Sequence, residues 1–398
     1  MKTLVAWDDP AEAELLDLYL NTDGSTAQLA RTREEVLGRA QAEDWDCLLL
    51  SLTFPARDQD SFSVFSEVQT ALTDVPVVIG CRPTEVMSLP RFLTHGARSH
   101  VIRDIQKDFI FLVRACLESA VEAAHAIEAS KLAQRLREEM ESVRKLQESI
   151  IPRGLEPPPG YRVSARYEPA QVHVLGERPL VLAGGDYYNL FRPDDRTLVL
   201  LVGDASGHGL KACMAIMAMH TLIRMLPGEV YRDTARFVAE INQRLCENSI
   251  VQNGEGFITL FYAALDTVDH TMTWTSAGHP PALVHRRDSN EVLPVGHDSD
   301  GGVPLGIAPG MDYPSKTFSI PPGSRVLIYS DGLADAFPVE QDGCRAFGVP
   351  GIIQTLLACG SQDLEHTLDQ LFQASLSCTA GQGRHDDTSV VLVERQID

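Results

Sequence analysis

The chain has 398 residues, enough for two or three domains, and its 44% hydrophobic and 22% charged residues exclude a mostly disordered chain. The formal net charge of −21 disfavours a nucleic-acid-binding surface, because Lys and Arg hold phosphate backbones. No run approaches the ~20 apolar residues of a membrane-spanning helix, and no apolar signal region follows Met1. The eight cysteines are scattered without a CxxC pair, which indicates reduced core thiols. We therefore expect a cytoplasmic protein that binds neither nucleic acid nor membrane.

Residues 1–120 alternate short apolar runs with helical stretches. The runs "TLVAW", "WDCLLLSL" and "VPVVIGC" predict strands, and "PAEAELLDLYLN" and "FSVFSEVQTAL" have helical spacing between them. Strands that alternate with helices predict a parallel sheet covered on both faces, which is a doubly wound α/β domain.

Residues 121–150 contain neither Gly nor Pro and predict one long helix, which Pro152 ends. Apolar residues recur along it at Leu132, Leu136, Val143, Leu146 and Ile150. This stripe predicts a short coiled-coil linker, although Glu139 interrupts it, and a solitary helix packed on either domain is the alternative. Because an isolated helix of this length is marginal in water, we expect a homodimer held by this helix and by the N-terminal domain.

Residues 151–398 are rich in short β patterns. Runs at 196–204, 258–266, 271–278, 324–332 and 388–396 predict strands, and helical blocks at 210–226, 231–249 and 350–377 interrupt them. Strand clusters with adjacent helix pairs predict a layered domain that contains both helices and sheets.

Acids recur in this last segment at strand ends or in the adjoining turns. They are Asp186 in "AGGDYYNL", Asp204 in "LLVGDASG", Asp331 in "LIYSDGLADAF", and Asp386 and Asp387 in "GRHDDTSVVLV". One such acid alone is typical of a turn, whereas several in one domain indicate a site. Carboxylates and backbone carbonyls suit magnesium or manganese. Two such ions about 4 Å apart could activate a water for attack on a phosphate ester.

Three other kinds of site fit this segment poorly. A P-loop fails because His208 stands five positions after Gly203 and no Gly-Lys-Ser/Thr follows. A nucleophile elbow fails because Ser206 lies one position too late in "GDASGHG". Zinc is disfavoured because these motifs contain no paired His or Cys.

Several motifs together resemble the metal-dependent protein serine/threonine phosphatases, in their SpoIIE/RsbU-like branch. They are "GGDYYNL", "VGDASGHGLKACMA", "GFITLFYAALD", "SAGHPPALV", "PLGIAPG", "LIYSDGLADAF" and "HDDTSVVLV". The match covers essentially residues 151–398, in the family's order. It implies an α-β-β-α sandwich with two Mn²⁺ or Mg²⁺ ions at one edge of the packed sheets.

The resemblance also implies a role for each site residue. Asp204 bridges both ions, and the carbonyl of Ala205 binds one of them. Asp331 and Asp386 complete the shell of the other ion, and Asp186 contributes directly or through water. His208 is the candidate proton donor to the departing serine oxygen, and a structural loop histidine is the alternative.

Departures from the family pattern remove no metal ligand. The segment "QVHVLGERPLVLA" at 171–183 is an insertion, Asn189 replaces a frequent acid, and Asp335 stands where Glu is frequent. We interpret "SAGHPP", at 276–281, as a turn scaffold rather than a catalytic element.

Residues 1–120 resemble a response-regulator receiver that lacks its central group. Asp8 and Asp9 match the acidic pair, but Ser51 occupies the position of the phosphoacceptor aspartate. Cys81 stands where Ser or Thr is usual, and Arg103-Asp104 replaces the usual Lys-Pro. A serine hydroxyl cannot form the acyl phosphate, so we expect a receiver fold kept for binding or dimerisation.

The sequence thus predicts a pseudo-receiver (1–120), a helical linker (121–150) and a phosphatase domain (151–398). We expect hydrolysis of phosphoserine or phosphothreonine on a partner protein by metal-activated water, without a covalent enzyme intermediate. By the resemblance, the usual partner is a phosphorylated anti-sigma-factor antagonist of the STAS type. The alternative is a pseudophosphatase that grips a phosphoprotein without turning it over, and a third hypothesis is a dimeric scaffold, which leaves the acids unexplained.

Overall fold

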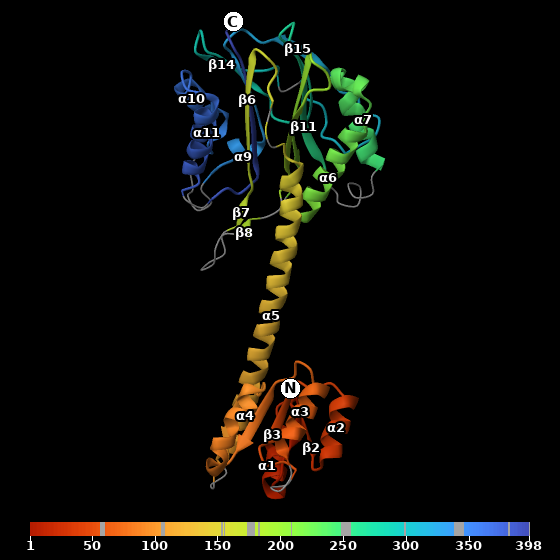
Figure 1. Ribbon diagram of the computed structural model, residues 1–398, viewed down its shortest axis with the longest axis vertical. Helices are drawn as coiled ribbons and strands as arrows, with labels where there is room; N and C mark the ends of the chain where they lie inside the picture. The colour runs from red at the N-terminus through yellow and green to blue at the C-terminus, as the bar shows by residue number, and fades with distance from the viewer. Residues whose placement is uncertain are drawn as a thin grey trace. The chain divides into compact units, whose positions relative to one another are not determined.

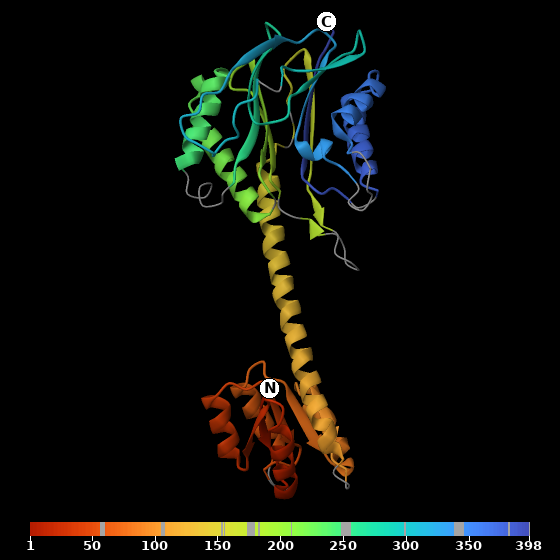
Figure 2. The same ribbon diagram turned by 180° about the vertical axis from the view of Figure 1, so that it is seen from behind.

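The computed structural model divides the chain into two compact units, Met1–Leu136 and Arg137–Asp398, drawn as ribbons in Figures 1 and 2. It describes residues 1–397 except 56–59, 105–107, 153, 155, 173–179, 182–183, 208, 248–255, 298–299, 338–345 and 381–382. Among the described helices, none is long and apolar enough to cross a membrane.

The first unit is built on a five-stranded parallel sheet in the order β2-β1-β3-β4-β5. Its strands are β1 (Lys2–Ala6), β2 (Thr26–Ala30), β3 (Cys47–Ser51), β4 (Val77–Cys81) and β5 (Ser99–Ile102). The intervening helices are α1 (Pro10–Leu20), α2 (Arg33–Ala42), α3 (Ser61–Ala71), the 3₁₀ helix η1 (Pro83–Ser88) and α4 (Leu89–Thr94). The predicted N-terminal parallel α/β sheet is therefore confirmed.

Both faces of this sheet are buried because successive side chains of a strand point to opposite sides. In β1, Leu4 and Ala6 join the core that packs against α2, α3 and α4. Val5 joins the opposite core, which packs against α1 and α5 (Phe109–Ile150). Helix α1 begins where it does because the Asp9 carboxylate accepts the N–H groups of residues 11 and 12, and Pro10 follows at the first helical position.

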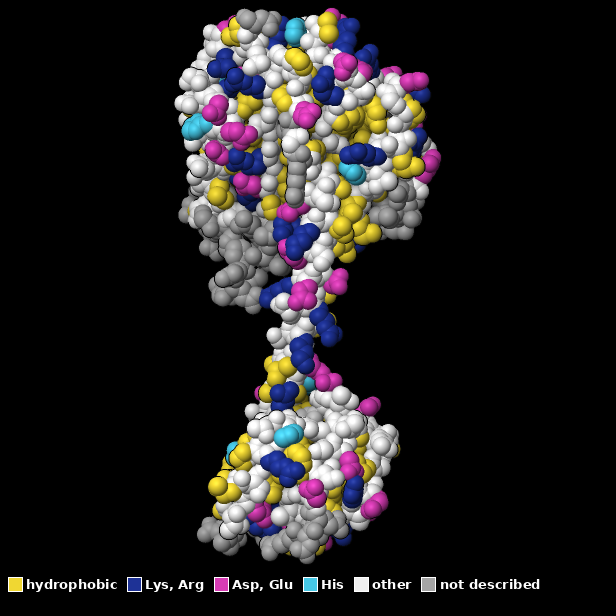
Figure 3. Space-filling model, in the orientation of Figure 1, with side chains coloured by type: hydrophobic (Ala, Val, Ile, Leu, Met, Phe, Trp, Pro, Cys, Tyr) yellow, Lys and Arg dark blue, Asp and Glu magenta, His cyan; other side chains and the backbone are white. Residues whose placement is uncertain are grey.

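Helix α5 is longer than the predicted linker. It runs without interruption from Phe109 to Ile150, since no Gly or Pro occurs between Gly96 and Pro152. Three residues of the apolar stripe, Leu132, Leu136 and Leu146, are 55–59% exposed. Figure 3 shows hydrophobic, basic and acidic side chains interspersed along this helix. Ile150, in contrast, packs against the core of the second unit.

The second unit contains two five-stranded sheets whose neighbouring strands are all antiparallel. The first, in the order β15-β12-β11-β10-β9, consists of β9 (Asp186–Phe191), β10 (Thr197–Ala205), β11 (Ile258–Asp266), β12 (Thr271–Ala277) and β15 (Lys316–Ser319). The second, in the order β14-β13-β16-β17-β6, consists of β6 (Tyr161–Glu168), β13 (Leu283–Arg286), β14 (Glu291–Pro294), β16 (Arg325–Tyr329) and β17 (Thr388–Arg395). The insertion contributes β7 (Gln171–Val172) and β8 (Leu180–Val181), which pair with each other, and its residues 173–179 and 182–183 lie outside the described residues.

The two sheets pack face to face, with helices on both outer sides (Figures 1 and 2). Leu200 of β10 and Val391 of β17 belong to the core between the sheets. Helices α6 (Leu210–Met225) and α7 (Thr234–Glu247), with the 3₁₀ helix η2 (Gly228–Arg232), cover the first sheet. Helices α9 (Asp331–Ala334), α10 (Gly348–Ala358) and α11 (Leu364–Cys378) cover the second.

The five predicted strands of this unit correspond to β10, β11, β12, β16 and β17. The helical block predicted at 350–377 is instead two helices, α10 and α11. The break occurs because Asp363 caps α11, its carboxylate accepting the N–H of His366. Gly360 lies in the connection between the two helices.

Candidate metal centre

Asp186 and Asp204 lie directly opposite each other on the antiparallel strands β9 and β10. Asp186 is 1% exposed, and its pKa is raised well above the ordinary value by burial and then by the nearby Asp204 and Asp387. The pKa of Asp204 is raised to about 8 by burial and then by Asp331, Asp386 and Asp387. Paired carboxylates across strands repel each other, so this arrangement favours a bound cation.

Asp331 reaches the same acidic region from the second sheet. It is the first residue of α9, directly after β16 and Ser330. Its Oδ1 atom is buried and has no hydrogen-bond partner among the described residues. Burial, and then Asp386 and Asp335, raise the pKa of Asp331 to about 6. A buried carboxylate oxygen that accepts no hydrogen bond fits a metal ligand.

Three oxygen atoms converge over Gly185. A Cβ atom at this position would lie 2.5 Å from the Ala205 carbonyl oxygen, 3.1 Å from the Gly207 carbonyl oxygen and 3.2 Å from Asp204 Oδ1. Only glycine leaves this space open. Two carbonyls and a carboxylate are the hard oxygen donors that Mg²⁺ and Mn²⁺ prefer, so these residues fit such an ion.

Two predicted site residues remain, Asp386 and His208. Asp386 is exposed, and it precedes β17 by two residues. His208 lies outside the described residues, between Gly207 and Gly209, whose φ angles of 80° and 84° favour glycine. Within the part of the chain that the structure describes, no three Asp, Glu, His or Cys side chains form a compact metal-binding group. The candidate donors are therefore spread over separate turns and include backbone carbonyls.

Two further residues, Ser330 and Gln147, hold this region in place and were not predicted from the sequence. Ser330 is fully buried; its hydroxyl donates to Asp186 Oδ2 at 2.6 Å and accepts the N–H of Ser389 at 2.9 Å. Gln147 of α5 bonds to the backbone at Gly184 and Asp186. The position of Gln147 between Val143 and Ile150 of the apolar stripe was the signal available in the sequence.

The "SAGHPP" turn connects the two sheets. His279 is buried, and its ring bonds to the Thr259 hydroxyl of β11 at 2.9 Å and to the Tyr329 carbonyl of β16 at 3.0 Å. Ser276 Oγ also bonds to the His279 backbone. Burial lowers the pKa of His279 to about 3, which keeps the ring neutral. These contacts agree with the interpretation of the segment as a turn scaffold.

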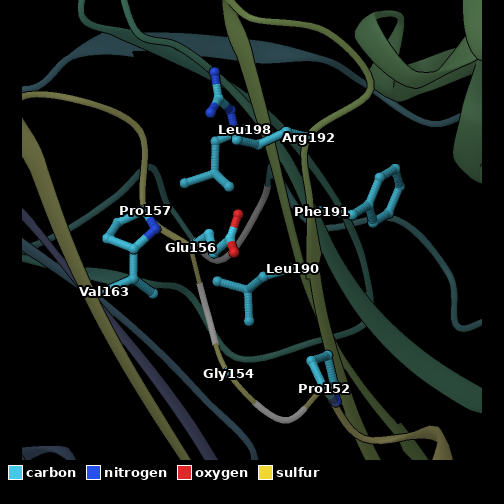
Figure 4. Close-up of a pocket in the computed structure, with 9 residues that line it drawn as sticks. All are labelled: Pro152, Gly154, Glu156, Pro157, Val163, Leu190, Phe191, Arg192 and Leu198. Carbon is cyan, nitrogen blue, oxygen red and sulfur yellow. The ribbon is translucent and has the colours of Figure 1, made fainter.

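One cavity of the second unit, about 250 Å³ in volume, lies between the edge strands β6 and β9 (Figure 4). It is lined by Pro152, Gly154, Glu156, Pro157, Val163, Leu190, Phe191, Arg192 and Leu198. The lining includes none of the candidate metal acids, so the cavity is separate from the acidic region.

The acidic pocket of the first unit is filled by an arginine. Arg103 Nη1 donates to Asp8 Oδ1 and to Ser51 Oγ, both at 2.7 Å, and Arg103 Nη2 lies 2.6 Å from Glu12. Ser51 Oγ donates to Asp8 at 2.6 Å. Burial would raise the pKa of Asp8, but Ser51 and Arg103 outweigh it and lower the value to about 2. Asp9 does not join this pocket, because its carboxylate caps α1.

Comparisons with known proteins agree with the motifs of the second unit. The model of the family "Stage II sporulation protein E (SpoIIE)" matches residues 194–396, about half of the chain. Protein IcfG of Synechocystis is 23% identical over 76% of the chain and 48% of its own length. Phosphoserine phosphatase RsbU of Bacillus subtilis is 20% identical over 79% of the chain and 87% of its own length. The chain thus spans about half the length of IcfG and most of RsbU.

The fold of the second unit occurs in a solved structure. The SiaA-PP2C domain of Pseudomonas aeruginosa superposes with a TM-score of 0.53 at 15% identity, over 67% of this chain and 99% of that one. The cell cycle transcriptional regulator CtrA of Caulobacter vibrioides is 25% identical over 108 residues, which are 27% of this chain and 46% of CtrA. This shorter match and the parallel sheet support a receiver-like first unit more weakly than the family match supports the second.

Proposed function

The chain belongs to the SpoIIE family, and on that premise we propose that it is a metal-dependent protein serine/threonine phosphatase in a bacterial signalling pathway. Its relative RsbU carries the name phosphoserine phosphatase. The observation that carries the proposal is the convergence of Asp204 Oδ1 and the Ala205 carbonyl over Gly185. Asp186 lies beside Asp204, and Asp331 presents a buried oxygen without a hydrogen bond among the described residues.

Five residues would hold two Mn²⁺ or Mg²⁺ ions. In this proposal Asp204 would contact both ions and the Ala205 carbonyl would bind one, while Asp331 and Asp386 would bind the other and Asp186 would contribute directly or through water. The chemistry that such ions supply is activation of water for attack on a phosphate ester. Burial and mutual repulsion raise the pKa values of Asp186, Asp204 and Asp331, which supports a site completed by cations.

The chain's own groups orient this site and move protons. The Ser330 hydroxyl donates to Oδ2 of Asp186 and would hold this carboxylate in place opposite Asp204. Gly185 keeps the space beside Ala205 open. We assign to His208 the transfer of a proton to the departing serine oxygen, with a structural loop role as the alternative.

The proposed substrate is a phosphorylated STAS-type anti-sigma-factor antagonist, and the proposed location is the cytoplasm. In this proposal residues 1–120 are a pseudo-receiver, 121–150 a helical linker and 151–398 the phosphatase domain. A homodimer would form through the receiver-like domain and residues 121–150. The exposed Leu132, Leu136 and Leu146 support a partner for this helix.

A pseudophosphatase that only grips a phosphoprotein is the competing function. Turnover of p-nitrophenyl phosphate by the full chain with Mn²⁺, and its loss in chelator, separates the two. An inactive wild-type protein that still binds a phosphorylated STAS protein would favour the binding role. Phosphatase assays on a phosphorylated STAS protein, with a phosphoserine peptide as control, then test the substrate.

A further inference from the structure

The two acids before β17 lie in different surroundings. Asp386 is exposed, whereas Asp387 is only 1% exposed. The Asp387 carboxylate accepts the N–H of Gly185 on Oδ2 at 2.6 Å and the N–H of Ala170 on Oδ1 at 2.8 Å. The Tyr167 hydroxyl donates to Oδ1 at the longer distance of 3.5 Å. Asp387 therefore connects the end of β6 to the turn before β9.

Two glycines of the acidic motifs pack against Asp387. A Cβ atom at Gly184 would lie 2.1 Å from Asp387 Oδ2, and a Cβ atom at Gly332 would lie 1.9 Å from the Asp387 carbonyl oxygen. A side chain at Gly184 would have to displace the Asp387 carboxylate, whereas a side chain at Gly332 would meet backbone, so position 332 requires glycine. Gly184 stands two residues before Asp186, and Gly332 directly follows Asp331. The turns that carry Asp186 and Asp331 therefore both pack against Asp387.

We infer that Asp387 is a positioning residue of the metal centre and that Asp386 alone of the pair faces the ions. Each carboxylate oxygen of Asp387 accepts a hydrogen bond from a backbone N–H group, which fixes the carboxylate against both segments. The bond to Gly185 fixes the turn whose Gly185 carbonyl accepts the N–H of Ala205 at 2.8 Å. Asp387 therefore positions the Ala205 carbonyl relative to Asp186. This role rests on the proposed function only because it assumes that metal ions bind here.

The variants Asp387→Asn and Asp386→Asn in the full chain test this role. Asparagine at 387 keeps one acceptor oxygen and turns an NH₂ group toward a backbone N–H, so one of the two bonds is lost. Hydrogen exchange is measured on metal-free protein in chelator, for the Gly185 and Ala170 amides, and Mn²⁺ affinity is measured by calorimetry. Asp387→Asn should speed exchange of the amide that loses its acceptor, Gly185 or Ala170, and weaken Mn²⁺ binding about 10-fold or more, the scale of outer-shell partners. Asp386→Asn should weaken Mn²⁺ binding and leave both exchanges unchanged.

Two results would overturn the inference. Weaker Mn²⁺ binding with unchanged exchange in Asp387→Asn would make Asp387 itself a ligand, and unchanged Mn²⁺ affinity would show that the turn does not need it. Tyr167→Phe is the matched control, because it removes only the longest contact and should change neither measurement. If Asp387→Asn does not fold, Gly184→Ala takes its place, because the added methyl group would displace the Asp387 carboxylate. The same exchange and Mn²⁺ measurements then have the same interpretation. A wild-type chain that binds no Mn²⁺ would refute the proposed function, while the exchange data would still test the hydrogen bonds.

Discussion

The side-chain amide of Gln147 in α5 pairs with the backbone of Gly184, two residues before Asp186. Gln147 Oε1 accepts the Gly184 N–H at 2.7 Å, and Nε2 donates to the carbonyls of Gly184 at 3.0 Å and Asp186 at 3.2 Å. Gln147 is 1% exposed. Leaving such a buried group unpaired costs about 1–3 kcal/mol. The last turns of α5 are therefore tied to the strand that carries a candidate metal ligand.

Gln147→Glu should weaken both folding and metal binding. The variant keeps the bond from the Gly184 N–H but turns a carboxylate oxygen toward two carbonyls, which repel it. We expect a loss of about 1–3 kcal/mol in the free energy of unfolding and about 10-fold weaker Mn²⁺ binding. Thermal denaturation and calorimetry measure the two effects. Ser149→Ala, an exposed change on the same helix turn, is the control, and equal behaviour of the two variants would contradict the expectation.

Asp204→Asn should abolish most phosphatase activity. In the proposed site Asp204 would contact both ions, so the substitution should weaken the binding of both together. We expect turnover of p-nitrophenyl phosphate with Mn²⁺ to fall by at least ~100-fold, the upper scale for loss of a metal-shell partner. Wild-type turnover in this variant, or full wild-type activity in excess chelator, would exclude the two-metal mechanism.

Small phosphodonors should not phosphorylate the first unit at Ser51. Receiver chemistry needs a carboxylate nucleophile beside a metal ion, whereas Ser51 offers a neutral hydroxyl that donates to Asp8. The guanidinium of Arg103 also occupies the acidic pocket. Incubation with acetyl phosphate should leave the intact mass unchanged, and a stoichiometric, acid-labile phosphate on this unit would refute the prediction.

The Asp8–Arg103 pair should give the first unit an acid-sensitive stability. The pKa of folded Asp8 is about 2, below its ordinary value of 3.8, so ionised Asp8 stabilises the fold above about pH 5. This stabilisation is lost as the pH falls through the folded pKa. The difference in melting temperature between wild type and Asp8→Asn should therefore shrink from pH 6 to about pH 3. A difference that stays constant over this range would show that Asp8 does not stabilise the unit through its charge.

Leu136→Glu with Val143→Glu should weaken the proposed homodimer and change the rate of the phosphatase. Leu136 is 56% exposed in the single chain, so a charge there costs little unless a partner helix covers it. Light scattering and turnover measure the two effects. Ser130→Glu with Gln134→Glu adds the same charge off the stripe and serves as the control. An unchanged dimer with unchanged turnover in the stripe variant would make the helix a spacer.

Local sequence patterns were enough to predict the elements that carry the site. Alternation of strands and helices predicted the parallel sheet of the first unit, because strands buried on both faces read as continuous apolar runs such as "CLLLS". The acids at strand ends predicted a metal site, and the resemblance of several whole motifs to a known family predicted the SpoIIE match. Absence of Gly and Pro predicted a helix over 121–150, although its true start at Phe109 required the packing of Val113 and Leu117 on the sheet.

The tertiary structure alone decided which side chains meet. Asp386 and Asp387 are adjacent and chemically identical, yet one is exposed and the other is buried against Gly184 and Gly185. The sequence could not distinguish the two acids, because the backbone N–H groups that bind Asp387 lie more than two hundred positions away. The role of Arg103 could not be predicted from the sequence either, because its ion pairs with Asp8 and Glu12 form only when β5 and β1 join the same sheet. The burial of Asp387 and Arg103, and with it the strength of their electrostatic interactions, is set by contacts between segments that are distant in the chain.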